Sequence, residues 1–307
     1  MDKKLKNTID KIVQLSRENI EFSAELRRRL GKDPSAESLS LDGERIEQIY
    51  EYCIEEVVKR QAEEFYADFP IKDIIPDLVK DFCRMESFRR KDCFGDFCLA
   101  VYQQLECIAN KLCGNSDLCE IAEHMWGYPA YVKTGDGITP SIENRGNGDY
   151  TIAALVFPGK NSKTGYSYAY EKSRMALQSL YAMDKIRSII YFVGYKSSMK
   201  NSDYEEYVTF TSLLSDVYQC RNTNHRGNTL KTWEQEIMDR VLPQKAVYYF
   251  KFLGALTQFV EMIKEGWGAL VDMRKYAIGL PGKKVQCMRL KVLDKIDIPD
   301  DGRKRIR

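Results

Sequence analysis

The chain has 307 residues, 44% of them hydrophobic, which is enough to bury a sizeable core as one large domain or two ordinary ones. Basic and acidic residues nearly balance at a formal net charge of +2, so a uniformly basic nucleic-acid-binding protein is excluded and only local patches remain. Basic runs occur at 27–29, 89–91 and 303–307, and each also fits a solvated helix end or a chain terminus.

Neither an export signal nor a metal-binding pattern is found in the sequence. The N-terminus is charged and lacks a signal peptide's apolar segment, and no stretch reaches the ~20 apolar residues that span a bilayer. Six of the nine cysteines lie between Cys83 and Cys119, without a CxxC pair and with only His124 nearby. We therefore expect a cytoplasmic protein without membrane contact, metal or cofactor.

Helical periodicity dominates the first half of the chain. It predicts helices over 3–30 and 44–65, and another that starts between Pro70 and Pro76. The most regular pattern lies at 94–113, where apolar residues recur at i, i+3, i+4 and i+7 without a gap. A short helix is expected over 117–126, with Ser116 as its N-terminal cap.

Glycine and proline gather between 127 and 165, where we expect a loop-rich insertion. Two β-like runs within it, 150–152 and 154–157, predict a small hairpin. The piece GKNSKTG at 159–165 lacks the glycine spacing of a phosphate-binding loop and is better explained as turns. Helical patterns then resume over 168–195, 204–221, 230–241 and 244–276.

Together these elements predict a mainly α protein. Its centre is an antiparallel helical bundle over 91–279, which the Gly-rich insertion (126–166) with its β-hairpin interrupts. An N-terminal helical region (1–90) precedes the bundle, and a basic tail (280–307) follows it.

The helix predicted at 204–221 leads into a polar end on its buried face. Its apolar stripe consists of Tyr207, Phe210, Leu214, Val217 and Tyr218. Steps of three and four residues continue the stripe to Arg221 and then to His225, so both would share this face if the helix extends that far. A guanidinium and an imidazole placed there need protein partners or a cleft.

A purely structural explanation is open. Arg221 would pair with a carboxylate of a neighbouring helix, and the helix dipole would favour His225 at the C-terminal end. Asn222 and Asn224 suit a helix end, and Gly227 suits the residue that stops the helix.

A catalytic explanation is also open. Arginine keeps its charge and binds phosphate oxygens through two hydrogen bonds, while histidine titrates near neutral pH and can move a proton. This pair suits RNA cleavage by the 2′-hydroxyl group, with His225 moving the proton and Arg221 stabilising the charge on the transition state. DNA lacks that hydroxyl group, so the mechanism selects RNA.

The order Arg221-Asn222, then His225-Arg226-Gly227, at the end of a bundle helix resembles the motif of HEPN domains. Many members of that superfamily are metal-independent endoribonucleases of bacterial defence, CRISPR and toxin systems. The resemblance implies Arg221 and His225 as the catalytic pair, with Asn222, Asn224 and Arg226 in support, and a homodimer with one composite cleft. Only three residues separate Arg221 from His225, fewer than is usual in the family.

Polar residues elsewhere in the bundle are further candidates. In HEPN domains a polar residue of another helix often supports the site, which would make Glu106 a partner of Arg221; otherwise Glu106 lies on a solvated face. Tyr248 and Tyr249 could stack on a base, although core packing also explains them.

Three functional hypotheses follow. The first is a homodimeric endoribonuclease of a bacterial antiviral defence or toxin system that cleaves RNA without a metal. The second is a non-catalytic HEPN-like module that binds RNA, a nucleotide or a partner protein. The third is a purely structural helical protein. An ion pair between Arg221 and a carboxylate of the same chain would support this third hypothesis. The N-terminal helices and the insertion lie outside the bundle, where a regulatory partner or nucleotide would act.

Overall fold

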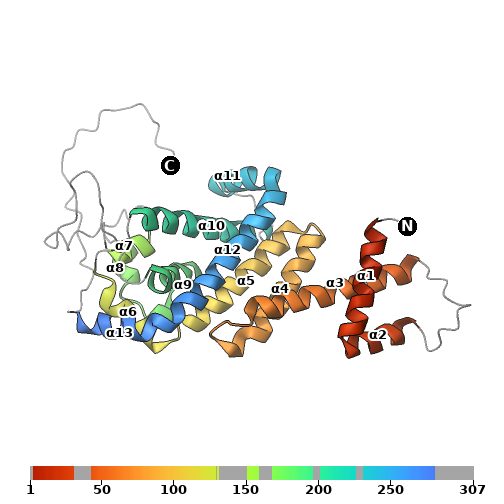
Figure 1. Ribbon diagram of the computed structural model, residues 1–307. Coiled ribbons are helices and arrows are strands. Elements are labelled where there is room, and N and C mark those ends of the chain that lie inside the picture. Colours follow the sequence, from red (N-terminus) through yellow and green to blue (C-terminus); the bar gives the residue numbers. More distant parts are fainter. Residues whose placement is uncertain are drawn as a thin grey trace, which may run out of the picture.

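The computed structural model describes residues 3–30, 43–128, 130, 151–158, 168–195, 201–225 and 231–280. Every regular element in these ranges is helical and none is a strand, so the prediction of a mainly α bundle is confirmed (Figure 1). The α-helices are α1 (Lys3–Glu18), α2 (Ile20–Leu30), α3 (Gly43–Tyr66), α4 (Ile75–Arg90), α5 (Phe94–Leu112), α6 (Ser116–Met125), α7 (Ile152–Val156), α8 (Tyr168–Lys172), α9 (Ala182–Ile189), α10 (Asn201–His225), α11 (Thr232–Val241), α12 (Lys245–Gly266) and α13 (Leu270–Gly279). Between them lie the 3₁₀ turns η1 (Lys72–Ile74), η4 (Leu177–Ser179), η6 (Leu242–Gln244) and η7 (Trp267–Ala269), and the π-helical turn η5 (Ile190–Tyr195).

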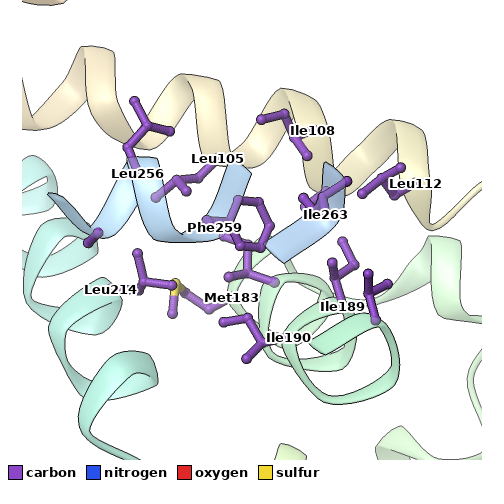
Figure 2. Packing of buried hydrophobic residues seen from close by; sticks show 14 of the residues in the cluster. Leu105, Ile108, Leu112, Met183, Ile189, Ile190, Leu214, Leu256, Phe259 and Ile263 are labelled. Carbon is purple, nitrogen blue, oxygen red and sulfur yellow. The ribbon is translucent and has the colours of Figure 1, made fainter. Parts of the chain in front are cut away.

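The larger core lies between α5, α9, α10 and α12 (Figure 2). Leu105 and Ile108 of α5 are fully buried, as are Phe259 and Ile263 of α12 and Leu214 of α10. Burial of each such side chain contributes roughly 1.5–3 kcal/mol to folding. The bundle therefore has a continuous apolar centre that fixes the direction in which α5 and α10 present their polar residues.

The short turn between α4 and α5 also holds the start of α12. Asp92 lies in this turn in the left-handed region, with a φ of 58°. Its carboxylate accepts a hydrogen bond from the Tyr249 hydroxyl at 3.2 Å and pairs with the Lys245 ammonium group. Tyr248 and Tyr249 are both buried, so core packing explains these two tyrosines.

The three N-terminal helices share a small core of their own, made of Leu15, Phe22 and Cys53. The single helix predicted over 3–30 is wrong, because α1 and α2 are separate helices. The Asn19 side chain accepts a hydrogen bond from the backbone N–H of Phe22 at 2.9 Å and so caps the start of α2.

The long helix predicted over 168–195 is also wrong, since the segment consists of α8, η4, α9 and η5. The backbone is extended at Ala176 (ψ 138°) and at Leu180 (ψ 160°). These two breaks let Leu177 and Leu180 both reach the core, where each is only 4% exposed. Burial of two leucines has therefore outweighed the helical propensity of the segment.

Two expectations for the region around the insertion need correction. The run 154–157, expected as a strand, lies largely in α7, whose N-terminal cap is Thr151. The cap of α6 is Asn115 and not Ser116, because the Asn115 side chain accepts the Leu118 N–H at 3.1 Å. Two of the three residues of the first β-like run, 151 and 152, likewise form the cap and the first residue of α7, while residue 150 lies outside the described ranges, as do GKNSKTG and the basic tail beyond Leu280.

The helix predicted over 244–276 is divided into α12, η7 and α13. At the end of α12, Gly266 lies directly against Val193 of η5, where a side chain would not fit. Beyond the division, α13 packs on α6, and the Arg274 Nε atom lies 2.6 Å from a Glu120 carboxylate oxygen. One straight helix would not make both contacts, which explains the break.

Candidate functional site

The helix α10 carries the predicted motif. It continues through His225, and its buried face includes Tyr207, Phe210, Leu214 and Val217, as the apolar stripe predicts. Arg221 follows on this face and is partly buried. The backbone of His225 lies one helical turn beyond Arg221, on the same face.

Arg221 packs against an aromatic ring and keeps part of its hydrogen-bonding capacity unused. Its guanidinium carbon lies 5.2 Å from the centroid of the Tyr102 ring. One Nη atom donates to the Asn222 side-chain oxygen at 3.0 Å, so these two adjacent residues of the motif are in contact. The Nε atom is buried and has no hydrogen-bond partner. Arg221 pairs with no carboxylate in the part of the chain that the structure describes.

Arg221 lines a cavity of about 410 Å³ between α5, α8, α9 and α10. Glu106 lines the same cavity, so the structure brings together two of the predicted site residues from different helices. The predicted ion pair between them is not formed among the described side chains. Burial raises the pKa of the Tyr102 hydroxyl, Glu106 raises it further and Arg221 lowers it. The other lining residues are Tyr168, Tyr181, Ala182, Met183, Asp184, Arg187, Ser215, Tyr218 and Gln219.

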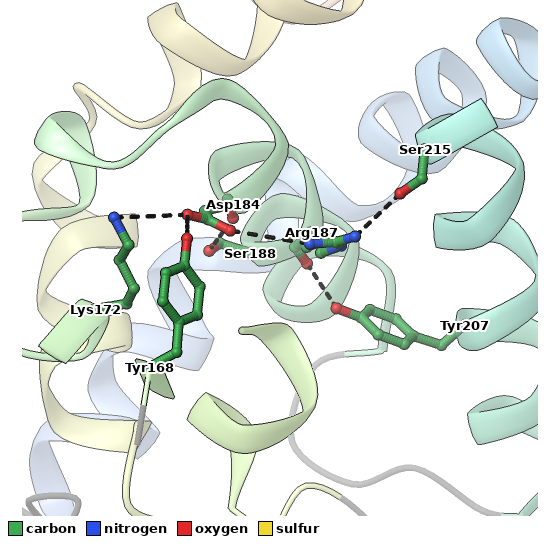
Figure 3. Close-up of polar contacts among 7 residues, drawn as sticks. All are labelled: Tyr168, Lys172, Asp184, Arg187, Ser188, Tyr207 and Ser215. Atoms are coloured by element: carbon green, nitrogen blue, oxygen red, sulfur yellow. Dashed lines mark hydrogen bonds and ion pairs between the residues drawn. The ribbon is translucent and has the colours of Figure 1, made fainter. Parts of the chain in front are cut away.

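A second arginine of the cavity belongs to a polar network (Figure 3). The Arg187 Nη2 atom donates to the Ser215 hydroxyl at 3.0 Å, and its Nη1 atom lies 3.9 Å from the Asp184 carboxylate. That carboxylate also accepts the Tyr168 hydroxyl at 2.9 Å and lies 4.0 Å from the Lys172 Nζ atom. Asp184 is only 4% exposed, and burial raises the pKa of its carboxyl group. The network holds Arg187 at the cavity wall. Its single carboxylate, Asp184, faces the two cations of Arg187 and Lys172, so the network keeps a net positive charge.

The remaining predicted site residues lie at the edge of the described structure. The side chains of Asn224 and His225 and all of Arg226 lie outside the described part of the chain. The structure therefore places the arginine of the motif in the cavity, while the position of the imidazole group stays a prediction.

Of the residues that line the cavity, sequence reasoning found only Arg221 and Glu106; those that it missed include Arg187, Tyr181 and Gln219. Arg187 and Tyr181 come from the segment that was predicted as one helix, and that pattern does not contain the chain break before α9. Gln219 stands two residues before Arg221, and its polar side chain within a buried helix was an available signal.

In each of the two basic runs that have described side chains, an arginine is paired with a carboxylate, unlike Arg221. Arg28 pairs with Glu25 at 2.6 Å, and Arg89 pairs with Glu86 at 2.7 Å. These arginines are partly neutralised by their own helices, which fits the explanation of solvated helix ends.

The described ranges contain neither a cluster of metal ligands nor a membrane-spanning helix. No three His, Cys, Asp or Glu side chains there come together as metal ligands. None of the described helices combines the length and apolar character needed to cross a membrane. The chain matches no family model, no curated protein and no solved structure.

Proposed function

We propose that the protein is a metal-independent endoribonuclease whose active site is the cavity at the C-terminal end of α10. The observation that carries this proposal is Arg221, which lines the cavity, is only partly buried and has no carboxylate partner among the described side chains. A permanent positive charge at a cavity wall without a protein carboxylate suits an anionic ligand. A phosphate group would supply the matching negative charge and accept hydrogen bonds from the accessible part of the guanidinium group.

The proposed chemistry is a transesterification within the RNA chain. The 2′-hydroxyl oxygen attacks the adjacent phosphorus, the bond to the 5′-oxygen of the next nucleotide breaks, and a 2′,3′-cyclic phosphate remains. His225 moves the proton, and Arg221 stabilises the charge that develops on the phosphate oxygens. The resemblance of the Arg221–His225 motif to HEPN domains supports the same roles, a homodimer and a bacterial defence or toxin setting.

The alternative is a module that binds RNA or a nucleotide without cleaving it. Two features favour it: the cavity of about 410 Å³ is the size of one nucleotide, and only three residues separate Arg221 from His225. The purely structural hypothesis is disfavoured, because Arg221 has no carboxylate partner among the described side chains.

The deciding experiment is RNA cleavage by the purified full-length protein in EDTA. We expect cleavage that leaves 2′,3′-cyclic phosphate ends and is blocked by a single 2′-deoxy substitution at the cut site. Arg221→Ala and His225→Ala should each reduce the rate by about 100-fold or more, as loss of a charge-stabilising or proton-transferring group does.

Matched controls exist in the chain. His124 is the only other histidine and lies on α6, outside the cavity, so His124→Ala should cleave normally. Arg274 is bound to Glu120 on the surface, so Arg274→Ala should also cleave normally. Absence of cleavage with retained, Arg221-dependent RNA binding would establish the binding module instead. Equal activity of Arg221→Ala and wild type would refute both proposals.

A further inference from the structure

The cavity contains polar groups that no described residue satisfies. The Gln219 Oε1 atom and the Arg221 Nε atom are buried without a hydrogen-bond partner. Glu106 lines the same cavity, and its carboxylate makes no hydrogen bond or ion pair with the described residues. Leaving the two buried atoms unpaired is costly to the folded protein. The Glu106 carboxylate is only partly buried, so it is solvated in the free protein and is available to a ligand.

The mouth of the cavity has an aromatic ring that a base can stack on. Tyr181 lines the cavity and yet is 71% exposed. The Lys172 Nζ atom lies 4.0 Å from the centroid of its ring, and the Lys172 side chain is itself almost fully buried. The lysine thus holds the ring at the mouth by a cation–π contact. Bases of single-stranded RNA commonly stack on exposed rings of this kind.

The unpaired acceptors favour one base over the others. An ionised carboxylate accepts hydrogen bonds through both oxygens and donates none. Guanine alone has two neighbouring N–H donor groups on its Watson–Crick edge, at N1 and at the exocyclic N2. Uracil has one N–H between two carbonyl oxygens, while adenine and cytosine each place a ring-nitrogen acceptor beside their amino group, and these acceptors would repel Glu106.

Asp184, the other carboxylate of the cavity, is already engaged. It accepts the Tyr168 hydroxyl and faces the cations of Lys172 and Arg187. Asp184 therefore holds Arg187 in place, while Glu106 stays available for a base. The two arginines remain for the phosphate group of the same nucleotide.

We infer that the cavity is a guanine-selective nucleotide site, in which Glu106 binds the Watson–Crick edge, Tyr181 stacks on the base and Arg221 and Arg187 bind the phosphate. This inference rests on the proposed function only in taking the nucleotide to be part of the RNA substrate. Gln219 forms part of the wall of the same cavity.

The test is binding of guanosine 3′-phosphate to the full-length protein by calorimetry, beside the adenosine, cytidine and uridine 3′-phosphates. We expect guanosine 3′-phosphate to bind on the order of tenfold tighter or more than the others, as a paired hydrogen bond to a base edge provides. Glu106→Gln keeps the shape but replaces one acceptor by a donor, so it should weaken binding of guanosine 3′-phosphate, tighten binding of adenosine 3′-phosphate, whose ring nitrogen is no longer repelled, and so abolish the preference. Tyr181→Ala should weaken all four alike.

The control variant is Glu123→Gln, an exposed glutamate of α6 outside the cavity, which should keep the preference. A preference for another base, no nucleotide binding, or a guanine preference that survives Glu106→Gln would each overturn the inference. Cleavage sites mapped on an RNA with all dinucleotides separate it from the proposed function. Cleavage without regard to guanine overturns the inference alone, and guanine-selective binding without cleavage overturns the endoribonuclease alone.

Discussion

Two glycines of α12 should respond in opposite ways to replacement by alanine. A Cβ atom on Gly266 would lie 2.7 Å from the Val193 Cγ1 atom and closer still to the Val193 carbonyl oxygen. Both are parts of the neighbouring turn η5, and a backbone oxygen cannot move aside as the end of a side chain can. Gly254, in the middle of α12, is exposed, and a Cβ atom there would meet no atom within 4 Å.

The expected magnitudes follow from two terms. Alanine is about 1 kcal/mol more favourable than glycine inside a helix, so Gly254→Ala should raise the free energy of unfolding by about 0.5–1 kcal/mol. Gly266→Ala has at most the same gain and adds an overpacking cost of about 1–3 kcal/mol. We therefore expect Gly266→Ala to be destabilised by up to about 2 kcal/mol, with the two variants about 1–3 kcal/mol apart.

Urea unfolding followed by circular dichroism measures this difference as a shift of the midpoint at constant slope. Both variants gain helix propensity from alanine, and this gain cancels when the two are compared. The difference between their free energies of unfolding therefore reports the cost of the contact with Val193. If Gly266→Ala were as stable as Gly254→Ala, the close approach of α12 to η5 would be refuted, and with it our explanation of the break between α12 and α13.

Three further outcomes are expected in denaturant unfolding. Tyr66→Phe removes the 2.7 Å hydrogen bond to Gln104 and leaves a buried acceptor unpaired, at a cost of about 1–3 kcal/mol. Asn115→Ala removes the cap of α6 and should cost about 1 kcal/mol, whereas Ser116→Ala should change little, and equal effects would contradict the assignment of the cap. Burial raises the pKa of the Asp184 carboxyl, so the stability of the wild type relative to Asp184→Asn should fall as the pH rises above the ordinary carboxyl pKa of about 4; a rise would contradict it.

Long and regular apolar periods were the most reliable guide to the fold. The helix predicted over 94–113 matches α5 within one residue, and 44–65 matches α3, because each buries one continuous face. The segment 168–195 has an equally apolar pattern, yet it breaks where Leu177 and Leu180 reach the core. Local periodicity does not contain that information, since the core that accepts these leucines is built by distant helices.

The same limit separates the site residues that the sequence predicted from those that it missed. Arg221 was predicted because it continues the stripe of its own helix, and that helix is regular up to the cavity. Arg187 and Tyr181 reach the cavity only because the chain turns before α9. Glu106 lines the same cavity as Arg221, but the ion pair considered for the two residues is not formed among the described side chains, and this leaves its carboxylate available.

The small N-terminal core has a consequence for how the protein opens in solution. Leu15, Phe22 and Cys53 are the buried residues of this cluster, and α1 and α2 lie at one end of the molecule (Figure 1). Burial of three side chains barely offsets the conformational entropy that α1 and α2 lose on folding. Amide hydrogens of α1 and α2 should therefore exchange with solvent through a local opening, whose free energy is far lower than that of the opening that exposes the amides of α5. The bundle should stay closed while α1 and α2 open and close.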